Sequence, residues 1–316
     1  AEQLGDATAT AGAASQAGIS AFGASGKSVN KRLASLRGGE TSLAAGNQVA
    51  SDNVWFEAHA NFADQDARKG AEGFETDTYG GTIGYDRAAG ANSRVGVAFT
   101  YSQSDIEGDS AANVDQDVDT YLVNLYGEQN MGKNFVNGSV HFGVQDADIS
   151  QTVLSLGAMS GSYATQQYGA NVEVGHNYEM GKGRVVPTAG LNWTHISGES
   201  YDLTDGAGVA TTESFSSRDQ VQAKVGVRYE HDYQTEQGAM FRPAVYGNFG
   251  YDFASDEVTT TRNFGGTLIN DEQAEISEES VGFGAAFTYE SPNRTTAVQI
   301  GYDGEYRDEY LSHGGK

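Results

Sequence analysis

From Asn53 onward, large apolar side chains occupy every second position in stretches of roughly ten residues. One stretch sets Val54 and Phe56 against Trp55 and Glu57. Successive side chains of a strand point to opposite sides, so this alternation predicts strands with one apolar and one polar face. Strands are expected to begin near residues 53, 75, 93, 118, 134, 163, 184, 217, 239, 279 and 294, and a twelfth near residue 310.

The connections between these strands alternate in length. Long acidic connections follow the odd-numbered strands, at 64–74, 103–117, 146–162, 197–216 and 252–278, whereas those after the even-numbered strands are short. Outer-membrane barrels combine long extracellular loops with short periplasmic turns in this way. A β-sandwich or a lipocalin-like barrel would also alternate in polarity, but neither needs this asymmetry of loop length.

These patterns predict an all-β transmembrane barrel of about 12 antiparallel strands in residues 53–316. An open sheet edge would expose unpaired amides to lipid, so the barrel should close through the twelfth strand. That strand starts near Tyr310 and is expected to be incomplete at Lys316. Aromatic residues recur near strand ends and could form interfacial girdles: Tyr85, Tyr101, Tyr178, Trp193, Tyr229, Tyr251 and Tyr289.

Residues 1–52 have a different character and are expected to form a linker and a helix that plugs the pore. The helical stretch runs from about Ala13 to Arg37 and precedes a Gly38-Gly39 connector. Its polar and basic residues are Lys27, Asn30, Lys31, Arg32 and Arg37. The predicted pore-lining residues are Glu57, His59, Glu173, Lys224, Arg228 and Arg242. The alternative is an ordinary linker with scattered lysines.

Opposite charges attract more strongly in a narrow, partly dehydrated pore than in bulk water. The basic helix is therefore expected to pair with luminal carboxylates such as Glu57 and Glu173. Glycines at polar-side positions such as 84, 96 and 226 would leave room for it, because a helix is roughly 10–12 Å wide.

The composition narrows the possible functions. A net charge of −24 argues against nucleic-acid binding, which requires a cationic surface. The chain has no cysteine and no run of roughly 20 apolar residues that would suggest a membrane-spanning helix. The six histidines lack zinc-site spacing, and no glycine-rich nucleotide loop is visible, so no cofactor is expected.

Acidic residues in the long connections admit two interpretations. The group Asp105, Glu107, Asp109, Asp115 and Asp117, and a second group within 271–279, could bind calcium. The preferred interpretation is a solvated surface, bridged by divalent ions to lipopolysaccharide phosphates.

Several segments resemble the translocator domain of autotransporters. The segment from Ser28 to Arg37 is one, and another is Val54–Ala58, followed by Asp64–Arg68 and the run from Thr76 to Asp86. Later similarities are Val95–Ser102 and Tyr121–Gly127. The resemblance implies a twelve-stranded barrel with a helix threaded through its lumen. It also implies type V secretion, in which an upstream passenger reaches the cell surface with help from the barrel-assembly machinery.

The chain departs from that family at two places. Family barrels end in a complete twelfth strand with a terminal aromatic residue, whereas this sequence stops at Lys316. Some members cleave an Asn-Asn pair, but Lys27-Ser28 stands at the matching positions here, so self-cleavage by that route is not expected.

The expected function is to secrete and anchor the chain's own N-terminal passenger from the Gram-negative outer membrane, in contact with lipid and lipopolysaccharide and without catalysis. A stand-alone porin or adhesin-like barrel is the binding-class alternative. The enzyme-class alternative is an outer-membrane hydrolase, which would need acid–histidine pairs at the loop rim.

Overall fold

The computed structural model describes residues 10–37, 52–67, 73–109, 114–153, 157–255, 259–264, 266–272, 277–292 and 297–316. The Gly38-Gly39 connector and part of the second acidic group lie outside these residues. The first described element is helix α2 (Thr10–Ser35), rich in alanine and free of proline, and strands make up nearly all of the other described residues.

Twelve strands form a closed antiparallel barrel, as predicted. They are β1 (Asp52–Gln65), β2 (Phe74–Ala88), β3 (Ser93–Gly108), β4 (Asp115–Met131), β5 (Asn134–Val153), β6 (Gly157–His176), β8 (Gly183–Ile196), β11 (Arg218–His231), β13 (Met240–Ser255), β16 (Glu279–Glu290), β17 (Ala297–Arg307) and β18 (Tyr310–Gly315). The barrel closes where β18 pairs with β17 on one side and with β1 on the other, from Ala60↔Gly315 to Gln65↔Tyr310.

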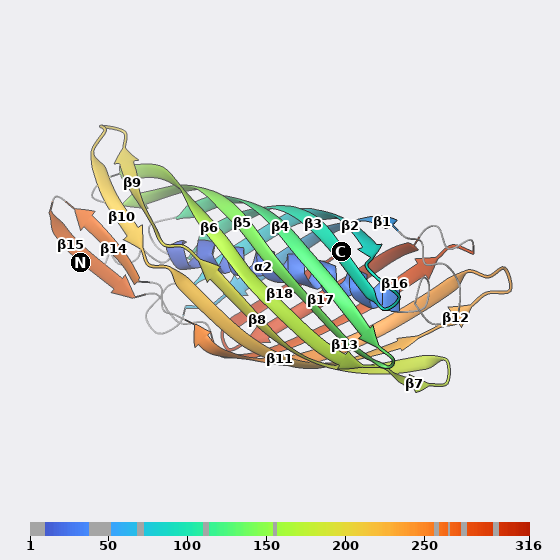
Figure 1. The fold of residues 1–316 in the computed structure, drawn as a ribbon. Coiled ribbons are helices and arrows are strands. Elements are labelled where there is room, and N and C mark those ends of the chain that lie inside the picture. The colour runs from blue at the N-terminus through green and yellow to red at the C-terminus, as the bar shows by residue number, and fades with distance from the viewer. Residues whose placement is uncertain are drawn as a thin grey trace.

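Six shorter strands extend this sheet at its two ends. β7 (Tyr178–Met180) and β12 (Tyr233–Gln234) lie at the end with the short turns. β9 (Glu199–Asp205) and β10 (Ala210–Phe215) form one hairpin at the opposite end, and β14 (Thr259–Phe264) and β15 (Thr267–Glu272) form another (Figure 1). β10 pairs with β14, and the tip of β6 pairs with β9.

Much of the chain predicted as long loops is therefore strand. β5 and β6 contain 20 residues each, about twice the roughly 9–11 that a membrane-spanning strand needs. Side chains keep alternating between the outside and the inside along β5, but the apolar residues move from the outward to the inward positions. Phe142 and Val144 point outward, and so do Asp146 and Asp148 beyond them, whereas Ile149 is buried inside. An apolar exterior with a polar interior thus gives way to a polar exterior with an apolar interior.

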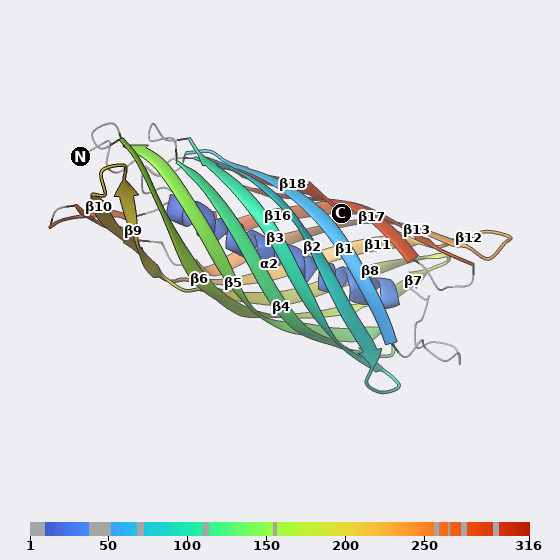
Figure 2. The same ribbon diagram turned by 90° about the horizontal axis from the view of Figure 1, so that it is seen from above.

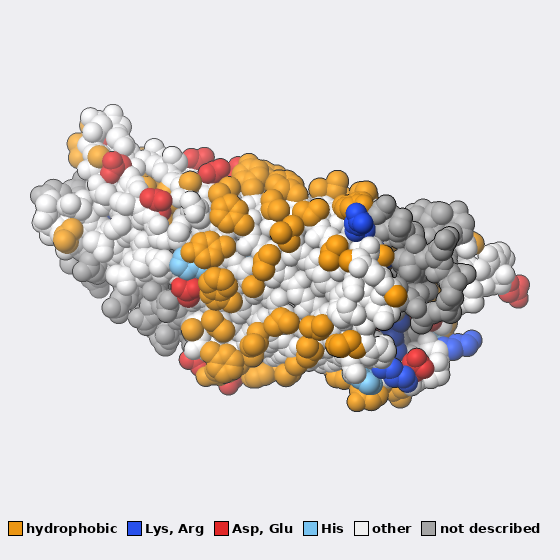
Figure 3. Space-filling model, viewed as in Figure 1, with side chains coloured by type: hydrophobic (Ala, Val, Ile, Leu, Met, Phe, Trp, Pro, Cys, Tyr) orange, Lys and Arg blue, Asp and Glu red, His pale blue; other side chains and the backbone are white. Residues whose placement is uncertain are grey.

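The outer surface carries an apolar band around its middle (Figure 3). Outward side chains there are strongly exposed, such as Val140 and Phe142 at 54% each. Apolar surface of this kind is stable only against lipid. At the border of the band nearer the β9–β10 hairpin, aromatic groups donate hydrogen bonds to carboxylates: Tyr101 to Asp119, Trp193 to Asp219, and Tyr251 to Glu278.

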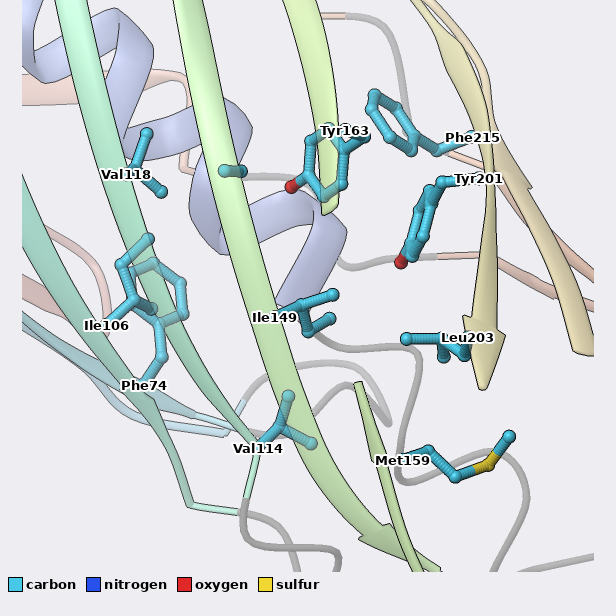
Figure 4. Close-up of a cluster of buried hydrophobic side chains, with 11 residues drawn as sticks. Phe74, Ile106, Val114, Val118, Ile149, Met159, Tyr163, Tyr201, Leu203 and Phe215 are labelled. Atoms are coloured by element: carbon cyan, nitrogen blue, oxygen red, sulfur yellow. The ribbon is translucent and has the colours of Figure 1, made fainter. Parts of the chain in front are cut away.

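Beyond the band, the interior holds a buried apolar cluster, which we name the outer core (Figure 4). It consists of Phe74, Ile106, Val114, Val118, Ala147, Ile149, Met159, Tyr163, Tyr201, Leu203 and Phe215. These side chains come from β2 to β6, from the residue preceding β4, and from the β9–β10 hairpin. The outer core explains why the strands continue above the membrane, because they have a core of their own to enclose.

Helix α2 lies inside the barrel, along its length (Figures 1 and 2). Large inward side chains lie flat against the barrel wall, and this leaves room for the helix in the lumen. The Trp55 ring covers Gly84, its register partner on β2, and the Tyr126 ring covers Gly96 on β3. A Cβ atom at either glycine would overlap the ring. The Trp55 indole also donates to the Tyr126 hydroxyl, at 2.8 Å.

A ladder of like charges crosses the outer face above the apolar band. Asp77, Asp105, Asp117 and Asp148 are register partners on β2, β3, β4 and β5, and all are exposed. Like charges directly opposite one another destabilise a sheet. A hydrogen bond with Asp105, followed by partial burial and the Asp105 charge, raises the pKa of the Asp117 carboxyl.

We predict that Asp117→Asn stabilises the barrel at neutral pH. Because the folded-state pKa of Asp117 is raised, its ionisation weakens the folded state above that pKa, and the penalty disappears as the pH falls through it. The temperature at which the folded band is lost on heat-modifiability gels should rise at about pH 8 and match the parent near pH 3. Asp119→Asn is the control and should lower that temperature, because it weakens the bond from Tyr101. A decrease for Asp117→Asn at about pH 8 would contradict the prediction.

Candidate functional site: the occupied lumen

Helix α2 packs against one side of the lumen rather than along its centre. Its described contacts are mainly with β2, β3, β4 and β5. On this face Phe22 stacks on His141 with ring centroids 3.5 Å apart, and Val29 and Leu33 are 1% exposed. Ser25 lies within hydrogen-bond distance of Thr100 and accepts a bond from Asn124. The helix therefore fits this wall through both apolar and polar contacts.

A buried carboxylate holds the C-terminal part of the helix. Asp86 of β2 is 0% exposed and accepts a hydrogen bond from Arg32 Nε at 2.8 Å. It also pairs with Arg94 of β3 and accepts weaker bonds from Tyr126 and Asn53. Four barrel strands, β1 to β4, thus contribute to the site that receives the Arg32 side chain of the helix.

A second arginine is held close by. Arg37 pairs with Glu128 of β4, and its guanidinium lies 3.7 Å from the centroid of the Phe135 ring. Asn130 donates to the same carboxylate. Arginine suits such sites because its planar group can pair with a carboxylate and stack on an aromatic face together.

The opposite face of the helix carries lysines and makes longer contacts. Lys27 Nζ lies 4.0 Å from Glu305, and Lys31 Nζ lies 3.7 Å from Asp303, both on β17. Lys224 of β11 also approaches Glu305, at 3.9 Å. These pairs span the lumen and are looser than the two arginine sites.

The predicted pore-lining residues occupy the inner wall at different heights. Glu57 accepts a hydrogen bond from Ser28 of the helix, Glu173 accepts one from Asn137, and His59 is buried. Lys224 and Arg228 line the same cavity as these three. Arg242 lies apart, buried at the short-turn end, where it pairs with Asp232.

The plug residues predicted on the helix also lie in the lumen, but their closest charged partners differ from those expected. Lys27, Lys31, Arg32 and Arg37 pair with Glu305, Asp303, Asp86 and Glu128, whereas Glu57 and Glu173 receive neutral donors. Asn30 faces the cavity. Asp86 and Glu128 could have been found from the alternation, since both fall on the polar side of their strands.

A polar cavity of about 330 Å³ remains beside the helix, mainly against β8, β11, β13 and β17. Amide and hydroxyl side chains such as Asn171, Asn192, Thr194 and Asn248 line it, together with Lys224 and Arg228. The lumen is thus occupied by the helix and a polar space, without a reactive constellation at its centre.

Among the described residues, no group of three or more histidines and acids could hold a metal ion. No helix within the described ranges is long and apolar enough to cross a membrane. His195 pairs with Asp219 at 3.0 Å, the kind of acid–histidine contact that the hydrolase alternative required. Trp193 donates to the same carboxylate and Tyr168 stacks on the imidazole, so the pair belongs to the aromatic border of the apolar band.

A closed barrel with an apolar outer band and a polar, occupied lumen defines a transport barrel of the outer membrane. The chain belongs to the autotransporter β-domain family, whose pattern it matches over residues 54–303. This agrees with the resemblance noted in the sequence.

Individual relatives agree with this assignment. Outer membrane protein B of Rickettsia typhi is 28% identical over 190 residues, which cover 55% of this chain and 12% of that protein. The chain therefore spans about an eighth of that relative's length. The translocator domain of the autotransporter NalP from Neisseria meningitidis has the same fold, with a TM-score of 0.65 at 12% identity, covering 93% of this chain and 94% of that one.

A second solved structure, the β-domain of the Bordetella autotransporter BrkA, gives a TM-score of 0.63 at 16% identity. The match covers 84% of this chain and 97% of that chain. At these identities the likeness establishes the fold and nothing finer.

We predict that Asp86→Asn loosens the helix. The substitution leaves Arg32 and Arg94 close together without their shared counter-charge, and breaking a buried pair typically costs about 3–5 kcal/mol. Single-channel conductance in a planar bilayer should rise, with more frequent open events, and the unfolding temperature should fall. Asp77→Asn, on the outer face of the same strand, is the matched control and should leave conductance unchanged. Unchanged conductance in Asp86→Asn would show that this site does not hold the helix.

Proposed function

We propose that this chain secretes and anchors a passenger that lies upstream of helix α2, and that the helix afterwards plugs the pore. Residues 1–52 would then be the linker and plug, and residues 53–316 the barrel. The membership of the autotransporter family supports this proposal.

The observation that carries it is the direction of the helix. Its C-terminal arginines bind near the short-turn end, at Asp86 and Glu128. Its N-terminal end points toward the end that carries the β9–β10 and β14–β15 hairpins (Figure 1). If the hairpins face outward, as the long loops of outer-membrane barrels do, the N-terminal end of helix α2 faces the cell surface.

Charge complementarity supports the plugging role. The helix brings four cations into a lumen whose wall supplies Asp86, Glu128, Asp303 and Glu305. Such pairs are screened less than exposed ones. An open porin would have no use for this matched set, so the occupied lumen favours the translocator over the porin alternative.

Two surfaces suggest partners beyond the passenger. The exposed acidic ladder lies just above the apolar band, at the depth expected for lipopolysaccharide phosphates, which divalent ions could bridge to it. Near the short turns, β18 covers neither β1 before Ala60 nor β17 before Gly301. We propose these edges as the surface that the barrel-assembly machinery contacts during insertion.

The first test is surface display. A small folded reporter fused upstream of residue 1, behind a signal peptide, should be cleaved from intact cells by an added protease. The same fusion lacking β16, β17 and β18 is the control, because it cannot close the barrel. A reporter that stays protected in cells with a heat-modifiable barrel would contradict the secretion role.

The second test is conductance. The full chain should show small conductance, and a chain starting at Asn53 should show a much larger one, because the lumen loses its occupant. A full-length Lys31→Gln, Arg32→Gln, Arg37→Gln variant should fall between them, since it keeps the helix but removes three of its charges. Equal, large conductance from all three would favour an open porin.

A further inference from the structure

The outer core lies in the interior of the barrel beyond the apolar band, between β2–β6 and the β9–β10 hairpin. Its side chains are 0–9% exposed, which is the burial of a protein core rather than of a channel wall. Ile106, Val118 and Ile149 come from the barrel strands. They lie at the end where helix α2 begins, as Figures 1 and 4 show.

The β9–β10 hairpin supplies the other half of this core. Tyr201 of β9 stacks on Tyr163 of β6 with ring centroids 4.7 Å apart, and Phe215 of β10 meets Tyr163 edge-on at 5.3 Å. Leu203 is 0% exposed. The hairpin is therefore packed into the barrel end, although only Met159 and Ser160 of β6 pair with β9 through the backbone.

A buried charge pair links the two hairpins. Glu213 of β10 and Arg262 of β14 are register partners, each 2% exposed, and they form an ion pair. Tyr201 donates to the same carboxylate at 2.8 Å. Burial, and then the Glu213 charge, raises the pKa of the Tyr201 hydroxyl well above its usual value, so it remains a donor. The second hairpin is thereby tied to the outer core.

The polar cavity beside the helix shares no residue with the outer core. Its lining includes Thr194, Gln220 and, at the start of β18, Tyr310. The helix alone leaves this cavity open along its lysine face.

We propose that the outer core is the cell-surface seal of the lumen, and that the β9–β10 hairpin is its movable half. In this arrangement the helix anchors and partly fills the pore, and the outer core closes the path that the helix leaves open. The seal does not require the passenger to exist, so it can be tested apart from the secretion role.

The attachment of the hairpin supports its movement. Both of its connections to the barrel break the strand pattern, at Ser197-Gly198 after β8 and at Ser216-Ser217 before β11. Side-chain hydroxyls complete the pairing there. The Ser197 hydroxyl accepts a hydrogen bond from the backbone N–H of Gln166, and the Ser216 hydroxyl accepts one from the backbone N–H of Thr259. A chain crossing the lumen would displace the hairpin at these two breaks, and the apolar contacts would draw it back.

The test uses thiol accessibility in intact cells, which is clean because the chain has no cysteine. Asn248→Cys places one thiol in the polar cavity, and Val209→Cys places one at the exposed tip of the β9–β10 hairpin. A sulfonated maleimide added outside should label Asn248→Cys at least about tenfold more slowly than Val209→Cys, because labelling must wait for local opening. Adding Leu203→Ala and Phe215→Ala to Asn248→Cys should bring its rate close to that of Val209→Cys.

Leu268→Ala, at an exposed leucine of β15, is the matched control and should leave Asn248→Cys protected. Each variant must show the heat-modifiable band of a folded barrel, and Leu203→Ala alone replaces the double variant if that one does not fold. Rapid labelling of Asn248→Cys with the outer core intact would overturn the proposal. So would continued protection in a folded outer-core variant, which would assign the seal to the helix. Neither result would bear on reporter display, which tests secretion separately.

Discussion

In a bilayer, every backbone N–H and C=O group has to be paired within the protein, and the rest of this structure follows from that requirement. A sheet meets it only by closing on itself, which β18 does over Ala60–Gln65 of β1 and from Gly301 to Arg307 of β17. Closure with an apolar exterior leaves a wall of polar side chains facing inward. A lumen of that kind has to be filled by water or by protein, and here helix α2 fills much of it with a matching set of charges.

The helix is held unequally on its two faces, and the chemistry of the cations explains the difference. Arg32 and Arg37 sit in sites built from several wall residues, where a planar guanidinium can pair and stack at once. Lys27 and Lys31 reach carboxylates at about 4 Å across a polar space. The arginine face determines where the helix lies, and the lysine face remains beside water. A helix held in this way is firmly placed without filling the whole cross-section.

Alternation along the sequence predicted the strand count and the closing strand near Tyr310, because the lipid-facing side chains repeat with a period of two. The helix in the lumen was expected on other grounds, namely its basic residues and the family resemblance. The sequence predicts acidic loops where the structure has the halves of the strands that lie beyond the apolar band. Their period is also two, but aspartates such as Asp146 and Asp148 take the outward positions that valine and phenylalanine hold lower down. A strand prediction that depends on outward apolar residues therefore ends where aspartates replace them. The ion partners were harder to anticipate, since Asp86 and Asp303 lie far apart in sequence, and only the barrel register and the off-centre helix place each beside its cation.

Because the apolar residues move from the outside to the inside along the strands, one continuous sheet is suited to lipid in its lower part and to water in its upper part. Within the lipid its apolar side faces out, and the interior must be polar enough to admit a charged chain. Beyond the lipid, water covers the outside, so the same strands can enclose an ordinary hydrophobic core. A passage that is polar along much of its length needs some element that excludes water, and the larger of the two buried apolar clusters among the described residues lies beyond the apolar band. The position of the outer core therefore follows from the solvent boundary itself: it lies at the first level along the barrel where apolar side chains can face inward without exposing polar ones to lipid.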